Sequence, residues 1–272
     1  MTSSKINRLR VGLFGAGRVA SALAPALAAA GHQVVFVASR TLASAQALAA
    51  ALPGCATLLQ PAALAAPPAA DVYLLAVPDA AVPELVAAGA WPAGALLAHV
   101  AGALPLAVFA ARPQVRGGVL YPLQTFSPGR RLDWPTVPLF VEAAEPSAEA
   151  TLLALARSLS QRVARLGSAE RLRLHLGAVW ASNFTNHLLG VAQQVLAEAG
   201  LPFELLHPLV RETVDKALAA QPSPYAVQTG PAVRHDAPTL AAHEAALVAH
   251  PAWQALYGQL TASIQAAAGP IG

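Results

Sequence analysis

The chain has 272 residues, of which 56% are hydrophobic and only 11% are charged. Seventeen basic residues against fourteen acidic ones give a formal charge of +3, and no basic run or stripe indicates a nucleic-acid partner. A single cysteine, Cys55, excludes an intramolecular disulfide and favours a reducing, cytoplasmic compartment.

One stretch without Asp, Glu, Lys or Arg, residues 85–111, is long enough to cross a bilayer. It is rich in Ala and Gly and is interrupted by Pro92 and Pro105, so two short buried strands joined by a turn explain it better. The first residues lead into a short apolar strand rather than a signal-peptide core. We therefore expect neither a membrane partner nor secretion.

Short apolar runs alternate with alanine-rich helical runs in the first half of the chain. This alternation predicts an α/β fold of the Rossmann type, with a doubly wound parallel sheet covered by helices on both faces. Gly31 is placed to end the first helix, and Thr41 is placed to cap the second. The predicted strands span residues 9–14, 33–38, 56–59, 72–77, 95–100, 118–121 and 137–142, and the predicted helices span 18–30, 42–52 and 80–88.

The pattern changes after residue 146. A helical run to residue 161 and a short strand over 162–166 complete the first half, and long helices follow over 169–199, 203–219, 237–249 and 251–268. We therefore predict a Rossmann domain over residues 1–167 and an all-helical domain over residues 168–272.

A glycine motif follows the first predicted strand and opens the first predicted helix, with the sequence Gly15-Ala16-Gly17-Arg18-Val19-Ala20. It matches the dinucleotide-binding pattern G-x-G-x-x-[G/A]. Gly15 permits a tight turn, Gly17 lets the backbone approach a pyrophosphate, and Ala20 allows close helix–strand packing. The pyrophosphate would bind the free N–H groups at the helix N-terminus. The alternative is a glycine turn without a ligand.

The residues at the end of the second predicted strand indicate which nicotinamide cofactor is bound. NAD enzymes usually carry an Asp or Glu there for the ribose 2′-hydroxyl, whereas this chain has Ser39, Arg40 and Thr41 and no acid before Asp71. A guanidinium with two hydroxyls suits the 2′-phosphate of NADP. We predict NADP as the cofactor; the alternative is that Arg40 is a solvated loop cation.

The fourth predicted strand ends in Val77, Pro78 and Asp79. Ligands of such folds bind at the carboxyl edge of the sheet, where this strand ends. These three residues could therefore line a ribose of the cofactor. Asp79 could instead cap the helix that follows.

The glycine motif, the segment Ala76-Val77-Pro78-Asp79 and a helical second domain together resemble the 6-phosphogluconate dehydrogenase-like superfamily. Pyrroline-5-carboxylate reductase and the β-hydroxyacid dehydrogenases belong to it. Three later segments are similar to a narrower bacterial family of NADP oxidoreductases, in which a helical domain of unknown function follows a Rossmann-like domain. They are YPLQTFS at 121–127, HLGAVWASNF at 175–184 and TGPAVRHD at 229–236.

This resemblance covers nearly the whole chain. It implies the fold, NADP binding and a homodimer formed through the helical domain, but it supplies no substrate. The chain departs from the family's pattern at three positions: Tyr121 replaces a usual histidine, Ala101 a usual serine and His235 a usual glycine. These departures weigh against a shared reaction more than against a shared fold.

Polar side chains gather on one stripe of the predicted helix over residues 175–187. At about 100° per residue, His175, Ser182 and Asn186 share this stripe, and Asn183 lies about one helical position off it. Polar groups on an apolar helix need partners or face a ligand, so Ser182 and Asn186 are candidates for substrate binding. The resemblance implies that this helix faces the nicotinamide and that an asparagine on it binds substrate, so Asn183 is a candidate. His175 could be a general acid, or a hydrogen-bonded core residue.

Two loops offer further candidates for substrate binding. Gln124 and Thr125 lie in a proline-flanked turn after a predicted strand, and Arg234 lies in the polar loop over residues 221–236. Arg234 could clamp a substrate or pair with Asp236. The histidines near this loop lack the spacing of a metal-binding motif, so no metal is predicted.

The predicted function is hydride transfer between the nicotinamide of NADP and a small imine or carbonyl metabolite. The chain has only Lys5 and Lys216, so the predicted helix over residues 175–187 lacks the lysine that β-hydroxyacid dehydrogenases use for alcohol oxidation. The alternative is a non-catalytic NADP-binding sensor or scaffold protein.

Overall fold

The computed structural model describes residues 8–268. The chain divides into two compact units, residues 1–183 and residues 184–272, and each is described by itself below. The predicted domain boundary, between residues 167 and 168, coincides with the start of the helix α6 (Ser168–Ala178), which lies in the first unit. Among the described residues, no helix combines the length and hydropathy needed to span a bilayer.

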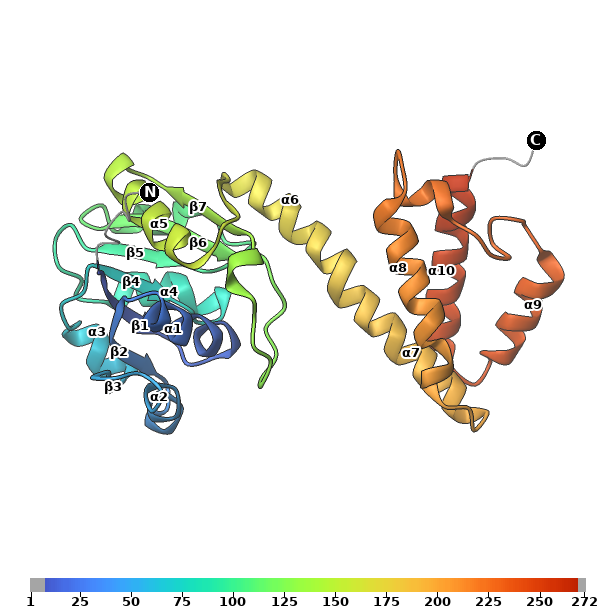
Figure 1. Ribbon diagram of the computed structural model, residues 1–272, viewed down its shortest axis with the longest axis horizontal. Helices are drawn as coiled ribbons and strands as arrows, with labels where there is room; N and C mark the ends of the chain where they lie inside the picture. Colours follow the sequence, from blue (N-terminus) through green and yellow to red (C-terminus); the bar gives the residue numbers. More distant parts are fainter. Residues whose placement is uncertain (1–7, 269–272) are drawn as a thin grey trace, which may run out of the picture. The chain divides into compact units, whose positions relative to one another are not determined.

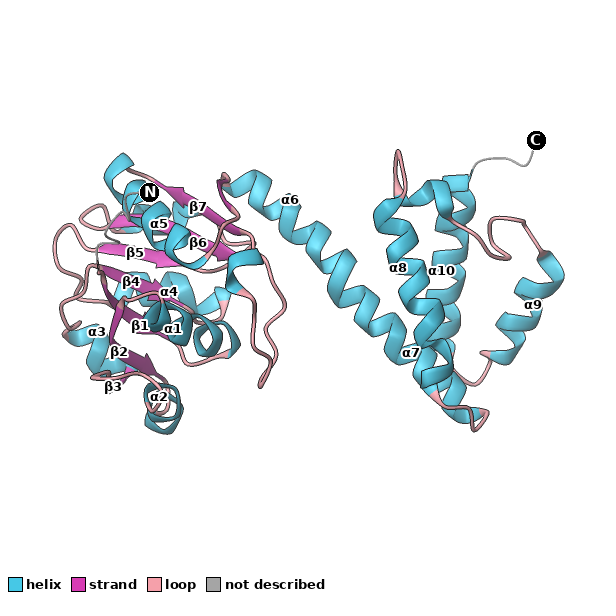
Figure 2. Ribbon diagram, in the orientation of Figure 1, coloured by secondary structure: helices cyan, strands magenta, loops and turns pink. Residues whose placement is uncertain are grey.

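An eight-stranded sheet forms the centre of the first unit (Figure 2). Its strands are β1 (Arg10–Phe14), β2 (Gln33–Ser39), β3 (Ala56–Leu59), β4 (Val72–Leu75), β5 (Leu96–His99), β6 (Arg116–Pro122), β7 (Leu139–Ala143) and β8 (Val163–Arg165). Their spatial order is β3-β2-β1-β4-β5-β6-β7-β8, and the first six run parallel. This order is the Rossmann arrangement, so the predicted fold class is confirmed.

The far end of the sheet differs from the all-parallel prediction. β7 pairs antiparallel with β6, and β8 then runs parallel to β7. The direction of β7 could not be read from its residues, because a buried parallel strand and a buried antiparallel strand have the same apolar pattern.

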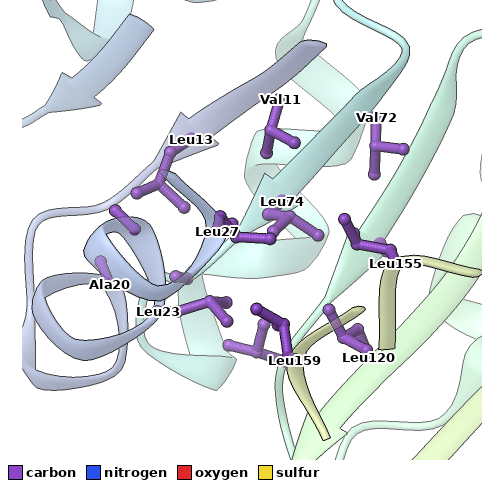
Figure 3. Packing of buried hydrophobic residues seen from close by; sticks show 14 of the residues in the cluster. Val11, Leu13, Ala20, Leu23, Leu27, Val72, Leu74, Leu120, Leu155 and Leu159 are labelled. Atoms are coloured by element: carbon purple, nitrogen blue, oxygen red, sulfur yellow. The ribbon is translucent and has the colours of Figure 1, made fainter. Parts of the chain in front are cut away.

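Helices cover both faces of the sheet (Figure 1). On one face lie α1 (Arg18–Ala29), α2 (Leu42–Ala49) and α5 (Pro146–Leu159), packed on a core that includes Leu13, Leu27, Leu74 and Leu155 (Figure 3). On the other face lie α3 (Gln60–Ala65), α4 (Val82–Ala88) and the 3-10 helix η2 (Leu106–Ala111). The two faces are filled by alternate residues of each strand, such as Leu13 and Phe14.

Two predicted helix boundaries are confirmed in this unit. Gly31, just after α1, has a left-handed φ of +91°. The Thr41 hydroxyl accepts a hydrogen bond from the backbone N–H of Ser44 at 3.4 Å and so caps α2.

The uncharged stretch over residues 85–111 does not form two strands, so that prediction was wrong. It contains the end of α4, the strand β5 and the 3-10 helix η2. A short apolar run bounded by proline has no periodicity that separates a strand from a helix, which explains the error at residues 106–111.

The long predicted helix over residues 169–199 is also interrupted. α6 passes into a π-helix, η4 (Val179–Phe184), before α7 (Thr185–Glu198) begins. Because a π-turn takes up an extra residue, the side chains after it are displaced on the helix surface. The assumption of 100° per residue fails here, so the predicted shared stripe of His175, Ser182 and Asn186 does not follow.

The second unit is all-helical among its described residues, as predicted. It contains α7, α8 (His207–Ala219), α9 (Ala237–Ala246), α10 (Pro251–Ala268) and the short 3-10 helices η5 (Phe203–Leu206) and η6 (Pro224–Val227). Of residues 184–268, Ala232 is the only buried one. Large apolar side chains remain exposed, among them Leu205 at 60%, Leu209 at 62% and Leu218 at 81%.

Candidate active site

The loop that joins β1 to α1 lies at the carboxyl edge of the sheet. Gly15 has a φ of +108°, and its N–H donates to the carbonyl oxygen of Ala38 in β2 at 2.8 Å. A Cβ atom on Gly15 would lie 2.2 Å from the carbonyl oxygen of Ala76, which follows β4. Only glycine fits this position, and it holds the loop at the point where the strand order reverses.

The second glycine of the motif faces open space. Gly17 is exposed and precedes α1, and nothing lies within 4 Å of a Cβ atom built on it. α1 has no side-chain cap and no acidic residue in its first turn. The free N–H groups and the helix dipole there favour an anion. The loop from Gly15 through Ala16, Gly17 and Arg18 to Val19 therefore fits a pyrophosphate.

A cation stands at the end of the neighbouring strand. Ser39 is the last residue of β2, and Arg40 beside it is exposed. Within the described part of the chain, Arg40 forms no ion pair, so its guanidinium is available to a ligand. The hydroxyl of Thr41 is already used to cap α2 and also lies 2.8 Å from the Ser44 hydroxyl.

The segment after β4 reaches the same edge. Val77 is half-buried, whereas Pro78 and Asp79 are exposed. Asp79 begins the short 3-10 helix η1 (Asp79–Ala81), and its carboxylate makes no capping hydrogen bond there. The geometry does not support the capping alternative, which leaves the carboxylate free to face a ligand.

A tyrosine and a histidine meet near the carboxyl end of β6. The Tyr121 hydroxyl lies 3.0 Å from Nδ1 of His175, which α6 supplies. The two rings meet edge to face, with centroids 5.9 Å apart. A Cβ atom on Gly102 would lie 2.5 Å from the same Nδ1, so the loop after β5 packs directly against the imidazole.

The surroundings of Tyr121 favour its neutral form. Burial raises the pKa of Tyr121; the positive charge of Arg171 opposes this shift, and the negative charge of Asp79 adds to it. The phenol therefore keeps its proton at neutral pH. The sequence predicted His175 as a site residue, but Tyr121 was noted only as a departure from the family's pattern. The signal that could have identified Tyr121 is a polar ring near the end of a buried strand.

α6 is fastened to the sheet by a buried charge. Arg171 is 1% exposed, and its guanidinium donates to the Glu142 carboxylate of β7 and, at 2.5 Å, to the carbonyl oxygen of Leu104. Glu142 also accepts hydrogen bonds from the backbone N–H and the hydroxyl of Ser168, at the start of α6. Breaking such a buried pair is costly, so the network fixes where α6 begins. It was not predicted.

A second buried histidine, His99, ends β5. Its Nδ1 accepts a hydrogen bond from the backbone N–H of Ala101 at 3.2 Å, and its Nε2 has no partner among the described residues. Burial, and then the charge of Arg171, lower the pKa of His99 to about 3, while the backbone of Pro105 acts in the opposite direction. It is therefore a neutral group that shapes the loop leading to Gly102.

The other predicted substrate residues have separate positions. The Gln124 and Thr125 side chains, exposed after β6, bond to each other at 3.3 Å. Ser182 and Asn183 lie in the π-helix at the end of the first unit, and Asn186 and Arg234 lie in the second unit. Their part in substrate binding stays a prediction. Among residues 8–268, no three His, Cys, Asp or Glu side chains form a group that could hold a metal ion.

Family models match both halves of the chain. A Rossmann-like domain matches residues 2–124, and the domain of unknown function DUF2520 matches residues 137–264. Comparison with curated proteins gives no match.

Solved structures extend this result. A protein described as a "putative NADP oxidoreductase", from Bacteroides fragilis, is 36% identical, with a TM-score of 0.87 over 96% of this chain and 100% of its own. A reductive aminase from Aspergillus terreus, in complex with NADPH and ethyl levulinate, is 19% identical, with a TM-score of 0.65 over 96% of this chain and 94% of its own. A pyrroline-5-carboxylate reductase from Coxiella burnetii is 15% identical, with a TM-score of 0.54 over 96% of this chain and 98% of its own.

The last two share the fold, and the first shares sequence over its entire length. The predicted family resemblance is confirmed. The chain belongs to the bacterial family in which a Rossmann-like domain is followed by the DUF2520 domain.

Proposed function

We propose that this protein is an NADP-dependent oxidoreductase that transfers a hydride between the nicotinamide and a small imine or carbonyl compound. One observation carries the proposal: at the carboxyl edge of the sheet, an uncapped helix N-terminus lies beside a strand end that bears Arg40, which has no ion-pair partner among residues 8–268. No acidic residue precedes Asp71, so nothing on these elements would repel a phosphate or select a free 2′-hydroxyl.

The sheet order supports a proposed position for each part of the cofactor. The pyrophosphate would bind at Gly17 and the N-terminus of α1, and the 2′-phosphate would bind Ser39 and Arg40 at the end of β2. The adenosine then covers the β2 side of the switch point, which leaves the ends of β4, β5 and β6 for the nicotinamide. When bound, the cofactor supplies or accepts the hydride.

The substrate class rests on the side chains and the relatives. Neither Lys5 nor Lys216 lies in the α6–α7 segment, so a helix lysine is not the proton donor there. A relative of the same fold carries NADPH together with ethyl levulinate, a keto ester, and another is named for the reduction of a cyclic imine. We infer reduction of a carbon–nitrogen or carbon–oxygen double bond, with Asn183 as a candidate substrate ligand.

Calorimetry tests the cofactor. We expect the wild type to bind NADPH more tightly than NADH, and Arg40→Ala to lose about tenfold or more in NADPH affinity while NADH affinity stays nearly constant. Arg157→Ala, which removes an exposed arginine from α5, is the matched control. Preference for NADH, or no binding of either cofactor, would contradict the proposal.

A turnover screen tests the reaction. Small imines, keto acids and hydroxy acids are offered with NADPH or NADP⁺, and the change in NADPH absorbance is followed. Tight NADPH binding without turnover of any compound would favour the alternative, a non-catalytic NADP-binding sensor or scaffold.

We also propose that the helical unit pairs with a second copy of the chain. Its described residues bury almost nothing by themselves, and Leu205, Leu209 and Leu218 project apolar side chains into solvent. Light scattering should give twice the 27.7 kDa chain mass, and Leu209→Glu should reduce it to the single-chain value. Leu42→Glu, at an exposed leucine of α2 in the first unit, is the control. A wild type of single-chain mass would exclude the pairing.

A further inference from the structure

We propose that the Tyr121 hydroxyl is the proton donor of the reaction and that His175 positions and reprotonates it. This inference rests on the proposed oxidoreductase function and goes beyond it by assigning the acid. The observation behind it is the 3.0 Å contact between the phenol oxygen and Nδ1 of His175.

The location of Tyr121 suits this role. β6 runs parallel to β5, β4 and β1, so the end of β6 lies at the same sheet edge as the glycine loop. With the adenosine on the β2 side, the nicotinamide and its substrate belong over the ends of β4 to β6. Asp79 begins the 3-10 helix that follows β4, so it lies at the same sheet edge as the end of β6.

A purely structural role explains the pair less well. α6 is already fastened by Arg171, whose guanidinium binds Glu142 and the Leu104 carbonyl, and by Ser168. The Tyr121–His175 contact lies one turn further along α6 and is not needed to hold its start. Gly102, which leaves no room for a side chain beside the imidazole, holds the ring where it meets the phenol.

The charges around the phenol agree with a donor. The groups that act on it are His175 from α6, Arg171 from the same helix and Asp79 from the β4 end. The net effect is a raised pKa for Tyr121, caused mainly by burial. A neutral phenol next to a hydride-accepting carbon has a proton to give at the moment when charge develops on nitrogen or oxygen.

The proposed step is balanced. The substrate carbon receives a hydride with its electron pair from the reduced nicotinamide, and the π bond to nitrogen or oxygen breaks. That nitrogen or oxygen takes the Tyr121 proton. His175 passes its Nδ1 proton to the phenolate oxygen and takes one from water at Nε2. The substrate gains two electrons and two hydrogens, and NADPH is the only reductant.

Three variants test the assignment. Tyr121→Phe removes the donor, His175→Leu removes the relay, and His175→Asn keeps an N–H where Nδ1 stands. Tyr257→Phe is the matched control, because the Tyr257 hydroxyl contacts Nδ1 of His243 at 2.8 Å in the same edge-to-face manner, on α10 and α9. Calorimetry with NADPH should give the wild-type affinity for all four variants.

Two readouts follow. In turnover with NADPH and the small cyclic imine 1-pyrroline, or an active compound from the screen, Tyr121→Phe should lose about 100-fold or more in kcat. Tyr257→Phe should lose nothing, and His175→Asn should keep more kcat than His175→Leu at an unchanged KM. In a tyrosinate absorbance titration without cofactor, the Tyr121 step, identified by its absence in Tyr121→Phe, should move to higher pH in His175→Leu.

The outcomes are separable. A wild type that turns over substrate while Tyr121→Phe matches it overturns the inference alone. A titration step that His175→Leu leaves in place also overturns it, because the hydrogen bond would then be absent in solution. A wild type that turns over nothing overturns the proposed function, and the inference falls with it.

Discussion

The carbonyl oxygen of Ala76 occupies the space that a side chain on Gly15 would need, since a Cβ atom there would lie 2.2 Å away. Gly17, two residues later, has only open space around it. One glycine of the motif is therefore required by the packing of β1 against the β4 end. The fold does not require the other, and the proposed approach of a pyrophosphate to the backbone would account for it.

This contrast predicts the behaviour of Gly17→Ala. The backbone at Gly17 has a φ of −83°, which alanine adopts freely, so the melting temperature should stay within a few degrees of the wild type. The added methyl group would enter the proposed pyrophosphate position and should weaken NADPH binding by about tenfold or more, measured by calorimetry. Gly15→Ala should instead melt at a much lower temperature. Unchanged NADPH affinity in Gly17→Ala would argue against the binding position.

Gly102→Ala tests the packing around His175. The methyl group would collide with the imidazole, turn it and break its contact with Tyr121, so kcat should fall toward the value of His175→Leu. Gly177→Ala is the control. Gly177 lies on the same helix, and apart from the backbone of that helix no described atom lies within 4 Å of its Cβ position, so the change should raise stability by up to about 1 kcal/mol. If the two variants had equal kcat, the loop after β5 would not position His175.

His99 predicts a loss of stability in acid. Its pKa is about 3 in the folded chain and about 6.5 when unfolded, so the unfolded chain binds more protons between these values. The stabilisation is fully present above pH 6.5 and is lost as the pH falls toward 3, by at most about 5 kcal/mol at roughly 1.4 kcal/mol per unit. His32, whose pKa is also lowered by burial, acts in the same direction.

Urea unfolding at pH 7 and pH 4 measures this effect. His99→Asn keeps an acceptor for the Ala101 N–H but cannot be protonated in this range. Its unfolding free energy should therefore fall less between the two pH values than that of the wild type. Carboxylates contribute equally to both proteins, so an identical fall would show that His99 is not held neutral.

His235→Gly should stabilise the second unit. His235 has a φ of +48°, the left-handed region in which a residue other than glycine pays about 1 kcal/mol. Because glycine is also more flexible when unfolded, the expected gain in unfolding free energy is between zero and about 1 kcal/mol. Arg211→Gly, on the exposed side of α8, should lose about 1 kcal/mol. Thermal melts of both variants decide the point; a destabilised His235→Gly would contradict the argument.

Sequence reasoning succeeded where the signal is local. The strand Ala56–Leu59 was predicted to the residue, and the glycine motif and Arg40 occupy the edge that their positions in the chain implied. It failed where the outcome depends on distant partners. Proline-bounded residues 106–111 became a 3-10 helix under β6 rather than a strand, and β7 reversed direction.

The same distinction holds for the site. A phosphate-binding loop is a contiguous motif, so its residues could be named before the structure. Tyr121 and His175 are 54 residues apart, and Arg171 and Glu142 are 29 apart. No spacing rule joins such pairs, because a tertiary fold, not a repeat of the chain, brings them into contact.

α6 makes two contacts with the sheet, Arg171 with Glu142 and His175 with Tyr121. The spacing of these contacts along the helix nearly equals their spacing along the strands. Arg171 and His175 are four residues apart, a helical rise of about 6 Å. Glu142, which binds Arg171, pairs with Val119 of β6, and Tyr121 lies two residues beyond it, a rise of about 6.6 Å. One residue inserted between Arg171 and His175 would leave the charge pair intact and rotate the imidazole about 100° away from the phenol. The distance from the buried Arg171–Glu142 pair to the proposed proton donor is therefore set by the rise per residue of a helix and of a strand.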